Sequence, residues 1–341
     1  MIISRTPYRI SFFGGGSDYP QWYREHGGQV LATSINKYCY ITCRYLPPFF
    51  EHRYRIVYSE IENREHVEEI HHPAVRETLK YLAIDRGVEI HHDGDLPARS
   101  GMGSSSSFTV GLLSVLHALQ GHMPSKDRLT AEAIYIESNL LHETVGSQDQ
   151  LLAAWGGFNH ALFNRNGEVQ VRPVTLSTGR IQELNDHLML FYTGHQRTAS
   201  DIAGSYVNGT TDFQATMDAV DEGLAILNST HNLDTFGELL HWTWEVKKSI
   251  SPKISSEYVD SIYDCARTTG AIGGKLLGAG GGGFMLLFVP PEKQAKIKGV
   301  LGKLLHVPFK FESQGSQIIF YDVEEDYSAV EASNGNLVQT H

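Results

Sequence analysis

Residues 97–107 read Pro97–Ala98–Arg99–Ser100–Gly101–Met102–Gly103–Ser104–Ser105–Ser106–Ser107, a loop of small residues with two glycines and a run of serines. It leads directly into residues 108–119, where apolar residues recur at helical spacing. A glycine-rich loop that opens a helix aims free backbone N–H groups at one point, and the helix dipole adds partial positive charge there. Phosphate is the usual occupant of such a site. A serine-rich linker or an ordinary helix N-cap is the structural alternative.

Two common phosphate-binding fingerprints do not fit this loop. It lacks the Gly-Lys-[Ser/Thr] ending of a Walker A loop, and it lacks the Gly-x-Gly-x-x-Gly spacing of a dinucleotide site. Phosphate binding is favoured instead by two further glycine clusters. Gly14–Gly16 follow a strand-like run over residues 2–13, and residues 278–283 precede an apolar strand over 284–289. Glycine clusters allow the backbone to approach a ligand closely, although a flexible turn or a bulge would also use them.

Composition excludes several classes of function. The chain has 341 residues, of which 41% are hydrophobic, and this length suggests about two domains with a substantial core. A net charge of −11 argues against a nucleic-acid or anionic membrane partner. Three cysteines form no disulfide framework, and neither a signal peptide nor a membrane-spanning run is evident. We therefore expect a cytoplasmic protein that binds small molecules.

Strands and helices are both expected along the whole chain. Strand patterns cover residues 2–13, 30–45, 53–59, 88–92, 187–193, 284–289 and 317–323, with a hairpin over 156–174. Helical patterns cover residues 19–26, 71–81, 108–119, 129–141, 199–206, 213–228, 233–250, 255–269 and 291–305. The chain changes domain around residues 177–185. We expect one domain over residues 1–183, a second over 184–323 and a polar tail over 324–341.

Three carboxylates have both a structural and a chemical interpretation. Asp18 follows the first glycine cluster and suits the N-cap of the next helix as well as a ligand contact. Glu137 lies among apolar residues, as a solvated charge or as a carboxylate turned toward a metal. Asp149 begins a helix, where it matches the helix dipole or serves as a base or electrostatic partner for a nucleophilic hydroxyl.

Three motifs now stand in a fixed order. They are Pro7–Tyr8–Arg9 with residues 14–18, Leu96–Pro97 with residues 100–106, and residues 275–283. This order resembles the three motifs of the GHMP kinase superfamily, which includes galactokinases and homoserine, mevalonate and phosphomevalonate kinases. Within the motifs, Arg5–Thr6–Pro7, residues 13–18, residues 103–108 and Tyr192–Thr193–Gly194 with Arg197 and Ala199 are most similar to the D-glycero-D-manno-heptose 7-phosphate kinases.

The resemblance implies an α+β fold with two domains and an active site between them. The N-terminal domain would be like domain 2 of ribosomal protein S5, with a left-handed βαβ crossover, and the C-terminal domain would be ferredoxin-like. ATP and Mg²⁺ are implied as cosubstrate and cofactor. The implied ATP-binding residues are Pro97, Ser100, Gly101, Met102, Gly103, Ser104, Ser105 and Ser106.

The resemblance also implies a role for each remaining site residue. Asp149 matches the aspartate near the accepting hydroxyl, and Arg9 matches a basic residue that stabilises that aspartate and the transferring phosphoryl group. Ser104 and Glu137 match the magnesium ligands, and Asp18 matches the aspartate that binds the sugar. The third glycine cluster would close over phosphates and substrate. The other implied substrate-binding residues are Gly15, Gly16, Ser17, Gly280 and Gly281.

Some residues depart from the family's usual pattern. Gly-Gly-Ser at residues 15–17 stands where galactokinases have Glu-His-Thr, which argues against galactose. Arg99 and Met102 replace residues that are usually small or Pro and Leu. A phosphorylated acceptor needs cationic anchors, and our candidates are Arg197 and Lys247, with Lys248 and Lys253 behind them. Surface charge is the alternative for each lysine.

We therefore expect an ATP-dependent kinase of the anomeric hydroxyl of D-glycero-D-manno-heptose 7-phosphate. Its product would be the 1,7-bisphosphate, for nucleotide-activated heptose and a lipopolysaccharide or capsule. A kinase of an unphosphorylated sugar, such as fucose or another hexose, is the first alternative. A non-catalytic sugar- or nucleotide-binding sensor is the second. The expected partners are a sugar phosphate and ATP, without nucleic acid or membrane, and a homodimer is compatible with the sequence.

Overall fold

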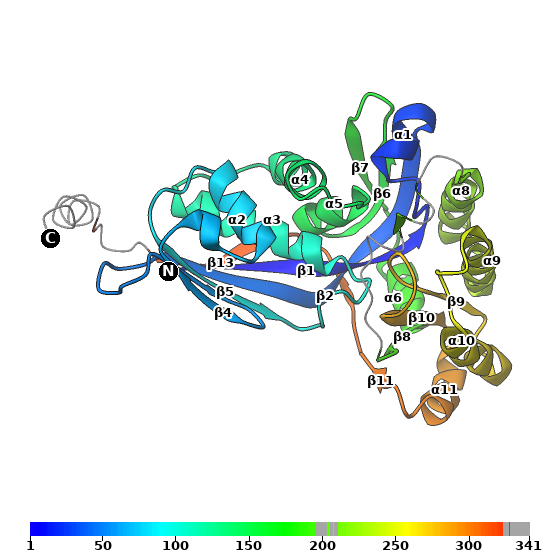
Figure 1. The fold of residues 1–341 in the computed structure, drawn as a ribbon. Coiled ribbons are helices and arrows are strands. Elements are labelled where there is room, and N and C mark those ends of the chain that lie inside the picture. The colour runs from blue at the N-terminus through cyan, green and yellow to red at the C-terminus, as the bar shows by residue number, and fades with distance from the viewer. Residues whose placement is uncertain (195–202, 205–206, 208–210, 323–326, 328–341) are drawn as a thin grey trace, which may run out of the picture.

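The computed structural model describes residues 1–194, 203, 204, 207, 211–322 and 327 (Figure 1). Two sheets organise these residues, one of nine strands and one of four. Figure 1 shows the larger sheet on the left with helices on one face and the smaller sheet on the right with its own helices. None of the helices described is both long and apolar enough to cross a membrane.

The long strand β2 organises the larger sheet. β2 (Gly28–Tyr45) pairs with β1 (Ile2–Phe13) along most of its length, with β6 at its first half and with β5 at its second. The strand order is β13-β1-β2-β5-β3-β4. In addition, β6 and β12 pair with β2, and β7 pairs with β6. The remaining strands are β3 (Tyr54–Val57), β4 (Ile61–Arg64), β5 (Val88–Gly94), β6 (Phe158–Phe163), β7 (Val169–Pro173), β12 (Phe311–Glu312) and β13 (Gln317–Tyr321).

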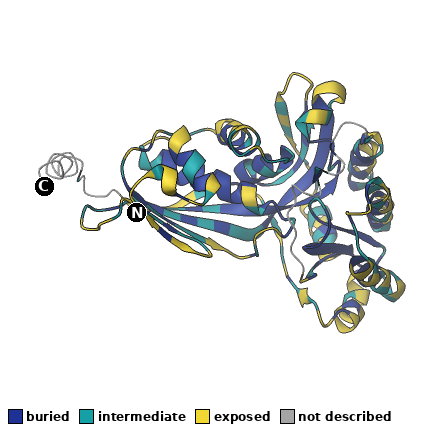
Figure 2. Ribbon diagram, in the orientation of Figure 1, coloured by how far each residue is buried: buried dark blue, intermediate teal, exposed yellow. Residues whose placement is uncertain are grey.

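Helix α3 (Ser104–Leu119) lies at the centre of the first half of the molecule. It packs on β1 and β2 and is contacted from its other side by α4 (Lys126–Tyr135) and α5 (Gln148–Trp155). Residues 106–117 of α3 are all buried, and Figure 2 shows that exposed residues lie mainly on the outer helices, loops and edge strands. A helix that is apolar on every side needs such a covered position. The sheet and its neighbours therefore fix the start of α3, where the serine-rich loop ends.

The predicted helix over residues 129–141 is not continuous. α4 gives way to a π-helical turn over Ile136–Leu140, and Glu137 stands in its first positions. π-turns inside helices are rare and occur mostly at functional sites. The turn changes the direction in which Glu137 leaves the helix, which the 3.6-residue periodicity of the sequence could not indicate.

The smaller sheet is antiparallel, in the order β11-β8-β10-β9. Its strands are β8 (Leu188–Tyr192), β9 (Gly273–Leu276), β10 (Phe284–Phe288) and β11 (Leu305–His306), and every residue of β10 is buried. Its helices are α8 (Gln214–Asn228), α9 (Asp234–Ile250), α10 (Glu257–Thr269) and α11 (Gln294–Val300). The other helices are α1 (Pro20–His26), α2 (Pro73–Tyr81), α6 (Thr178–Asp186) and the short 3₁₀ turns Val67–Glu69 and Pro291–Lys293.

Two differences from the sequence-based division are clear. Residues 178–186 form helix α6, where the sequence predicts only a change of domain. Strands β12 and β13 return to the larger sheet, so the segment expected as a second domain over 184–323 does not stay with the smaller sheet to its end. The predicted helix over 199–206 and most of the predicted tail over 324–341 fall outside the described residues.

An aromatic cluster joins the two sheets. The ring of Phe236 on α9 lies 5.5 Å from that of Phe12 and 5.0 Å from that of Phe13, both in edge-on geometry. Phe288 of β10 belongs to the same buried cluster. Aromatic pairs of this kind add to the energy of burial. The end of β1, which carries the first glycine cluster, is therefore held against the smaller sheet.

Candidate active site

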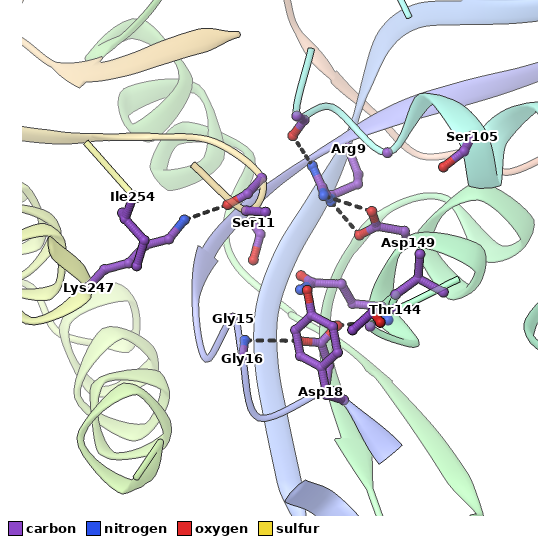
Figure 3. A pocket seen from close by; sticks show the side chains of 18 of the residues that line it. Arg9, Ser11, Gly15, Gly16, Asp18, Ser105, Thr144, Asp149, Lys247 and Ile254 are labelled. Atoms are coloured by element: carbon purple, nitrogen blue, oxygen red, sulfur yellow. Dashed lines mark hydrogen bonds and ion pairs between the residues drawn. The ribbon is translucent and has the colours of Figure 1, made fainter. Parts of the chain in front are cut away.

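A cavity of about 250 Å³ opens between the two sheets, at the end of β1. Arg9, Asp18 and Asp149 line it from the side of the larger sheet, and Lys247 and Lys275 line it from the other (Figure 3). The loop before α3 contributes Gly101, Gly103, Ser104 and Ser105. The first N–H groups of a helix have no partner within it, so the start of α3 presents backbone donors and a positive dipole end to this cavity.

Arg9 and Asp149 form a bidentate ion pair in the cavity wall. Arg9 Nε donates to Asp149 Oδ1 at 2.8 Å, and Arg9 Nη2 donates to Oδ2 at 2.9 Å. Arg9 Nη1 also donates to the carbonyl of Gly101 at 2.7 Å. Arginine binds a carboxylate through two parallel bonds in a fixed geometry. A single guanidinium therefore fixes the Asp149 carboxylate relative to the loop before α3.

The second and third glycine clusters contact each other backbone to backbone. A Cβ atom on Gly101 would lie 2.5 Å from the carbonyl oxygen of Leu277, and one on Gly278 would lie 2.5 Å from the Cα of Gly101. Gly283 is equally close to Ser100, since a Cβ there would lie 2.2 Å from the Ser100 oxygen. No side chain fits at these contacts. Gly101 and two glycines of the distant third cluster, Gly278 and Gly283, are therefore needed to bring the two loops together.

Asp18 is buried at the floor of the cavity. Its Oδ1 accepts from the Gly16 amide at 3.0 Å and its Oδ2 from the Gln148 amide at 3.3 Å. Gly146 is necessary beside it, because a Cβ there would lie 1.9 Å from Asp18 Oδ2. Burial, followed by repulsion from Asp149, raises the pKa of Asp18 to about 6.

Two lysines enter from the smaller sheet and its helices. Lys247, in the last turn of α9, donates to the carbonyl of Gly278, and Lys275 of β9 donates to the carbonyl of Phe12 at 2.8 Å. Burial, followed by repulsion from Arg9, lowers the pKa of Lys247 to about 8. Burial and the neighbouring Lys247 and Arg9 lower the pKa of Lys275 well below its usual range. The cavity thus brings two amino groups close to the loop before α3.

Two family models match the chain. The GHMP kinases N terminal domain covers residues 67–157, and the GHMP kinases C terminal domain covers residues 222–306. Together these matches account for more than half of the chain. The chain belongs to the GHMP kinase family.

Relatives extend over nearly the whole of this GHMP kinase. A D-glycero-alpha-D-manno-heptose 7-phosphate kinase of Campylobacter jejuni is 29% identical over 322 residues, which cover 89% of this chain and 93% of that protein. A bifunctional fucokinase/GDP-fucose pyrophosphorylase of Arabidopsis thaliana is 24% identical over 318 residues, covering 85% of this chain and 30% of that protein. These findings identify the chain as an ATP-dependent sugar kinase.

A solved structure shows the same fold. A D-glycero-D-manno-heptose 1-phosphate kinase from Bacteriodes thetaiotaomicron superposes with a TM-score of 0.76 at 23% identity, and the match covers 95% of this chain and 100% of that one. The expected α+β fold with two domains is thereby confirmed.

The residues predicted to hold magnesium fit a hard cation. Glu137 Oε2 accepts from Ser106 Oγ at 2.8 Å and from the Gln150 amide, whereas Oε1 is buried and has no hydrogen-bond partner among the described residues. Burial raises the pKa of Glu137 to about 7. Ser104 lines the cavity at the start of α3, the helix that also carries Ser106. Mg²⁺ is usually held by one or two carboxylates together with substrate phosphates, which matches this sparse set.

The structure brings ten of the predicted site residues to the cavity wall. They are Arg9, Gly15, Gly16, Asp18, Gly101, Gly103, Ser104, Ser105, Asp149 and Lys247.

Eight others within the described residues support the wall from behind. Ser17 and Ser100 are buried and bond to backbone carbonyls of their own turns, Met102 lies in the core, and Ser106 bonds Glu137. Gly280 packs against Ile254, whose carbonyl accepts from Gly281. Pro97 and Glu137 also stand outside the wall. Arg197 lies outside the described residues.

Several wall residues are absent from the sequence prediction. Phe213 is the clearest, since its ring lies against Gly16, where a Cβ would come within 2.3 Å. Glu143, Thr144 and Gln148 also line the cavity. Gln148 could have been found from its place beside Asp149, but a lone phenylalanine before a helix carries no signal of its own.

Proposed function

We propose that this enzyme transfers the terminal phosphoryl group of ATP to the anomeric hydroxyl of D-glycero-D-manno-heptose 7-phosphate, giving the 1,7-bisphosphate. The observation that carries the proposal is the bidentate Arg9–Asp149 pair at the phosphate-binding loop, in a chain whose heptose 7-phosphate kinase relative matches over 89% of its length. The product would serve the synthesis of nucleotide-activated heptose for surface polysaccharide.

The residues of the cavity suit phosphoryl transfer, which depends on positioning and charge neutralisation more than on covalent chemistry. The Asp149 carboxylate would orient the anomeric hydroxyl and accept or direct its proton, while Arg9 holds that carboxylate in place. Backbone N–H groups at Ser104 and Ser105 would bind phosphate oxygens. Asp18 would hold sugar hydroxyls, since its buried carboxylate faces the same cavity.

A magnesium ion would be held by Glu137 and Ser104 in this proposal. When bound, it would neutralise charge on the phosphates of ATP. Glu137 is ready for that role, because Ser106 and Gln150 fix one of its oxygens and leave the other without a partner among the described residues.

The acceptor's own phosphate needs a separate anchor. Arg197 follows strand β8 in the sequence and is our first candidate, and Lys247 is the second. Lys248 is removed from the set, because its ammonium group pairs with Glu245 at 2.9 Å and lies 3.7 Å from Asp260. Lys247 donates to the carbonyl of Gly278, and this position favours another role, so Arg197 is the anchor that we propose. We expect Arg197→Ala to raise KM for the phosphorylated sugar more than KM for ATP. Equal increases in both would refute a contact with that phosphate.

Phosphorus NMR of the purified enzyme with Mg·ATP would test the function. D-glycero-D-manno-heptose 7-phosphate, mannose and fucose would be supplied in parallel. A new anomeric phosphate signal only with the heptose phosphate establishes both reaction and acceptor. A signal only with a free sugar retains the kinase and favours the fucokinase-like alternative. ATP binding without any product would favour a sensor.

A further inference from the structure

We propose that Lys247 binds the phosphoryl group in transfer and is a catalytic residue, rather than an anchor for the acceptor's own phosphate. The inference deepens the proposed function and rests on it for the reaction. It assigns Lys247 to the anomeric end of the acceptor, across the cavity from Arg9 and Asp149.

The position of Lys247 is set through the interlocked glycine loops. Its ammonium group donates to the carbonyl of Gly278, and the backbone of Gly278 touches that of Gly101. The carbonyl of Gly101 in turn accepts from Arg9 Nη1 at 2.7 Å. Figure 3 shows Lys247 reaching into the cavity from the side opposite Arg9 and Asp149. Lys247 and Arg9 are thus tied to adjoining glycines that together form one edge of the cavity.

The charge of Lys247 has no carboxylate bound to it among the described residues. The charged groups that act on it are Arg9 of β1, Asp18 of the first glycine loop and Lys275 of β9. On its own helix, Glu245 is engaged by Lys248. A carbonyl satisfies a hydrogen bond of an ammonium group but does not neutralise its charge. An anion with several oxygens, placed between Lys247 and Arg9, would supply the negative charge that neutralises Lys247.

The geometry of the acceptor decides whether Lys247 binds the phosphate on C7 or the phosphoryl group in transfer. In a heptose 7-phosphate, the phosphate is on C7, at the far end of the molecule from the anomeric hydroxyl on C1. Lys247 lines the same cavity as Arg9 and Asp149 and donates to the carbonyl of Gly278, whose backbone touches Gly101, so we place it at the reacting end. In the transfer step, the anomeric oxygen bonds to the terminal phosphorus while the bond from that phosphorus to the bridging oxygen breaks and ADP leaves. The hydroxyl proton passes to Asp149 or to water, and Lys247 remains protonated against the charged phosphoryl oxygens.

Lys247→Met tests the assignment, with Lys248→Met as the matched control on the same helix. We expect Lys247→Met to lower kcat about 100-fold with heptose 7-phosphate and with the unphosphorylated heptose alike, as for other lost transition-state contacts. Lys248→Met should leave both rates within about twofold, since its partners Glu245 and Asp260 are on the surface. An unchanged kcat with a raised KM for the phosphorylated acceptor alone would overturn the proposal and make Lys247 the acceptor's phosphate anchor.

Nucleotide binding separates this proposal from the choice of acceptor. By calorimetry, Lys247→Met should weaken binding of Mg·AMPPNP at least tenfold and leave Mg·ADP within about threefold, because only the former carries a terminal phosphoryl group. Equal effects on both nucleotides would refute the assignment, whatever the acceptor proves to be. If the wild type turns over no heptose phosphate but Lys247→Met still loses this discrimination, the acceptor is wrong and the role of Lys247 stands.

The pH dependence gives a third readout. With a pKa of about 8 in the free enzyme, Lys247 loses its proton as the pH rises through that value. The kcat/KM for ATP should therefore fall above about pH 8 in the wild type. Lys247→Arg remains charged, so this decline should be absent in that variant. A decline that is identical in Lys247→Arg would assign it to another group and contradict the proposal.

Discussion

The charged side chains on the two sides of the cavity have different kinds of partner. On the side of the larger sheet, the Arg9 guanidinium is matched by the Asp149 carboxylate, and Asp18 accepts from two backbone amides. On the side of the smaller sheet, Lys247 and Lys275 donate only to the carbonyls of Gly278 and Phe12 in the hydrogen bonds described. On the first side, the charged groups have an ion-pair partner or amide donors, whereas on the second side the amino groups have only carbonyl partners in the hydrogen bonds described.

This difference indicates that the larger-sheet side is preorganised, whereas the smaller-sheet side gains its counterion when an anion binds. Fixed dipoles and ion pairs that need no rearrangement lower the barrier to reaction. Buried cations without counterions destabilise the folded protein, and active sites are where such arrangements persist. We therefore expect changes on the first side to affect catalysis through lost geometry, and changes on the second side to affect binding of phosphate groups.

Asp149→Ala should have the largest effect, because it removes the carboxylate and leaves Arg9 without its partner. We expect kcat to fall about 1000-fold with KM for ATP little changed, in line with the loss of a general base or an orienting carboxylate. Steady-state kinetics, with circular dichroism to verify folding, would measure this. Unchanged turnover in a folded variant would remove Asp149 from the mechanism.

Arg9→Lys tests whether geometry, beyond charge, matters on this side. Lysine keeps the positive charge but cannot make the two parallel bonds to Asp149 and the bond to Gly101 at once. We expect kcat to fall about 100-fold, within the range for cationic groups in phosphoryl transfer. A variant with wild-type kcat would show that a positive charge suffices at position 9. Arg9 and Lys247 would then both act through charge alone.

Gly101→Ala disturbs the contact between the two loops, and Gly121→Ala is its control. Both glycines have positive φ, 81° and 75°, but a Cβ at Gly101 lies 2.5 Å from the Leu277 oxygen, while nothing lies within 4 Å at Gly121. Both variants should lose about 1 kcal/mol of stability from backbone strain. Only Gly101→Ala should also weaken ATP binding, about tenfold, as measured by calorimetry. Equal ATP affinities would show that the loop tolerates the shift.

The sequence predicts the elements that follow strong local patterns. The spans of β1, β2, α3, α8, α9 and β10 agree with their predictions to within a few residues. Arg9, Asp18 and Asp149, predicted from motif matches, meet in one cavity. Arg9 lies within β1, Asp18 follows the turn after β1, and Asp149 lies in the first turn of α5. Glycine clusters were informative, since close backbone contacts leave glycine as the residue that fits.

Other features depend on tertiary contacts that carry little local signal. The return of β13 to pair with β1 joins residues more than 300 positions apart in the chain. The π-turn at Glu137 breaks a periodic helix pattern without glycine or proline to mark it. Ser17 and Ser106 lie in motifs predicted to bind ligands, but their hydroxyl groups donate hydrogen bonds to other protein groups. Local sequence gives the residue types near a ligand, and packing decides which of them reach it.

Asp18→Asn should have the smallest effect on turnover, and it separates substrate binding from folding. The pKa of Asp18 rises from 3.8 in the unfolded chain to about 6 in the folded protein. Its contribution to stability is thus fully present below about pH 4 and is lost as the pH rises through about 6. Asparagine does not titrate, so the stability of the variant relative to the wild type should increase over this window, by up to about 3 kcal/mol above pH 7.

Denaturant unfolding at several pH values would measure that gain, and kinetics at pH 8 would measure its functional consequence. We expect Asp18→Asn to be more stable than the wild type at pH 8 and to have a raised KM for the sugar. This combination would show that burial of the carboxylate beside Asp149 is retained for substrate binding at the expense of stability. A stability difference that does not change between about pH 4 and pH 8 would mean that Asp18 stays ionised throughout. The two amide donors would then stabilise the Asp18 carboxylate enough to offset its burial and its repulsion from Asp149. Both carboxylates on the larger-sheet side of the cavity would be ionised without a ligand.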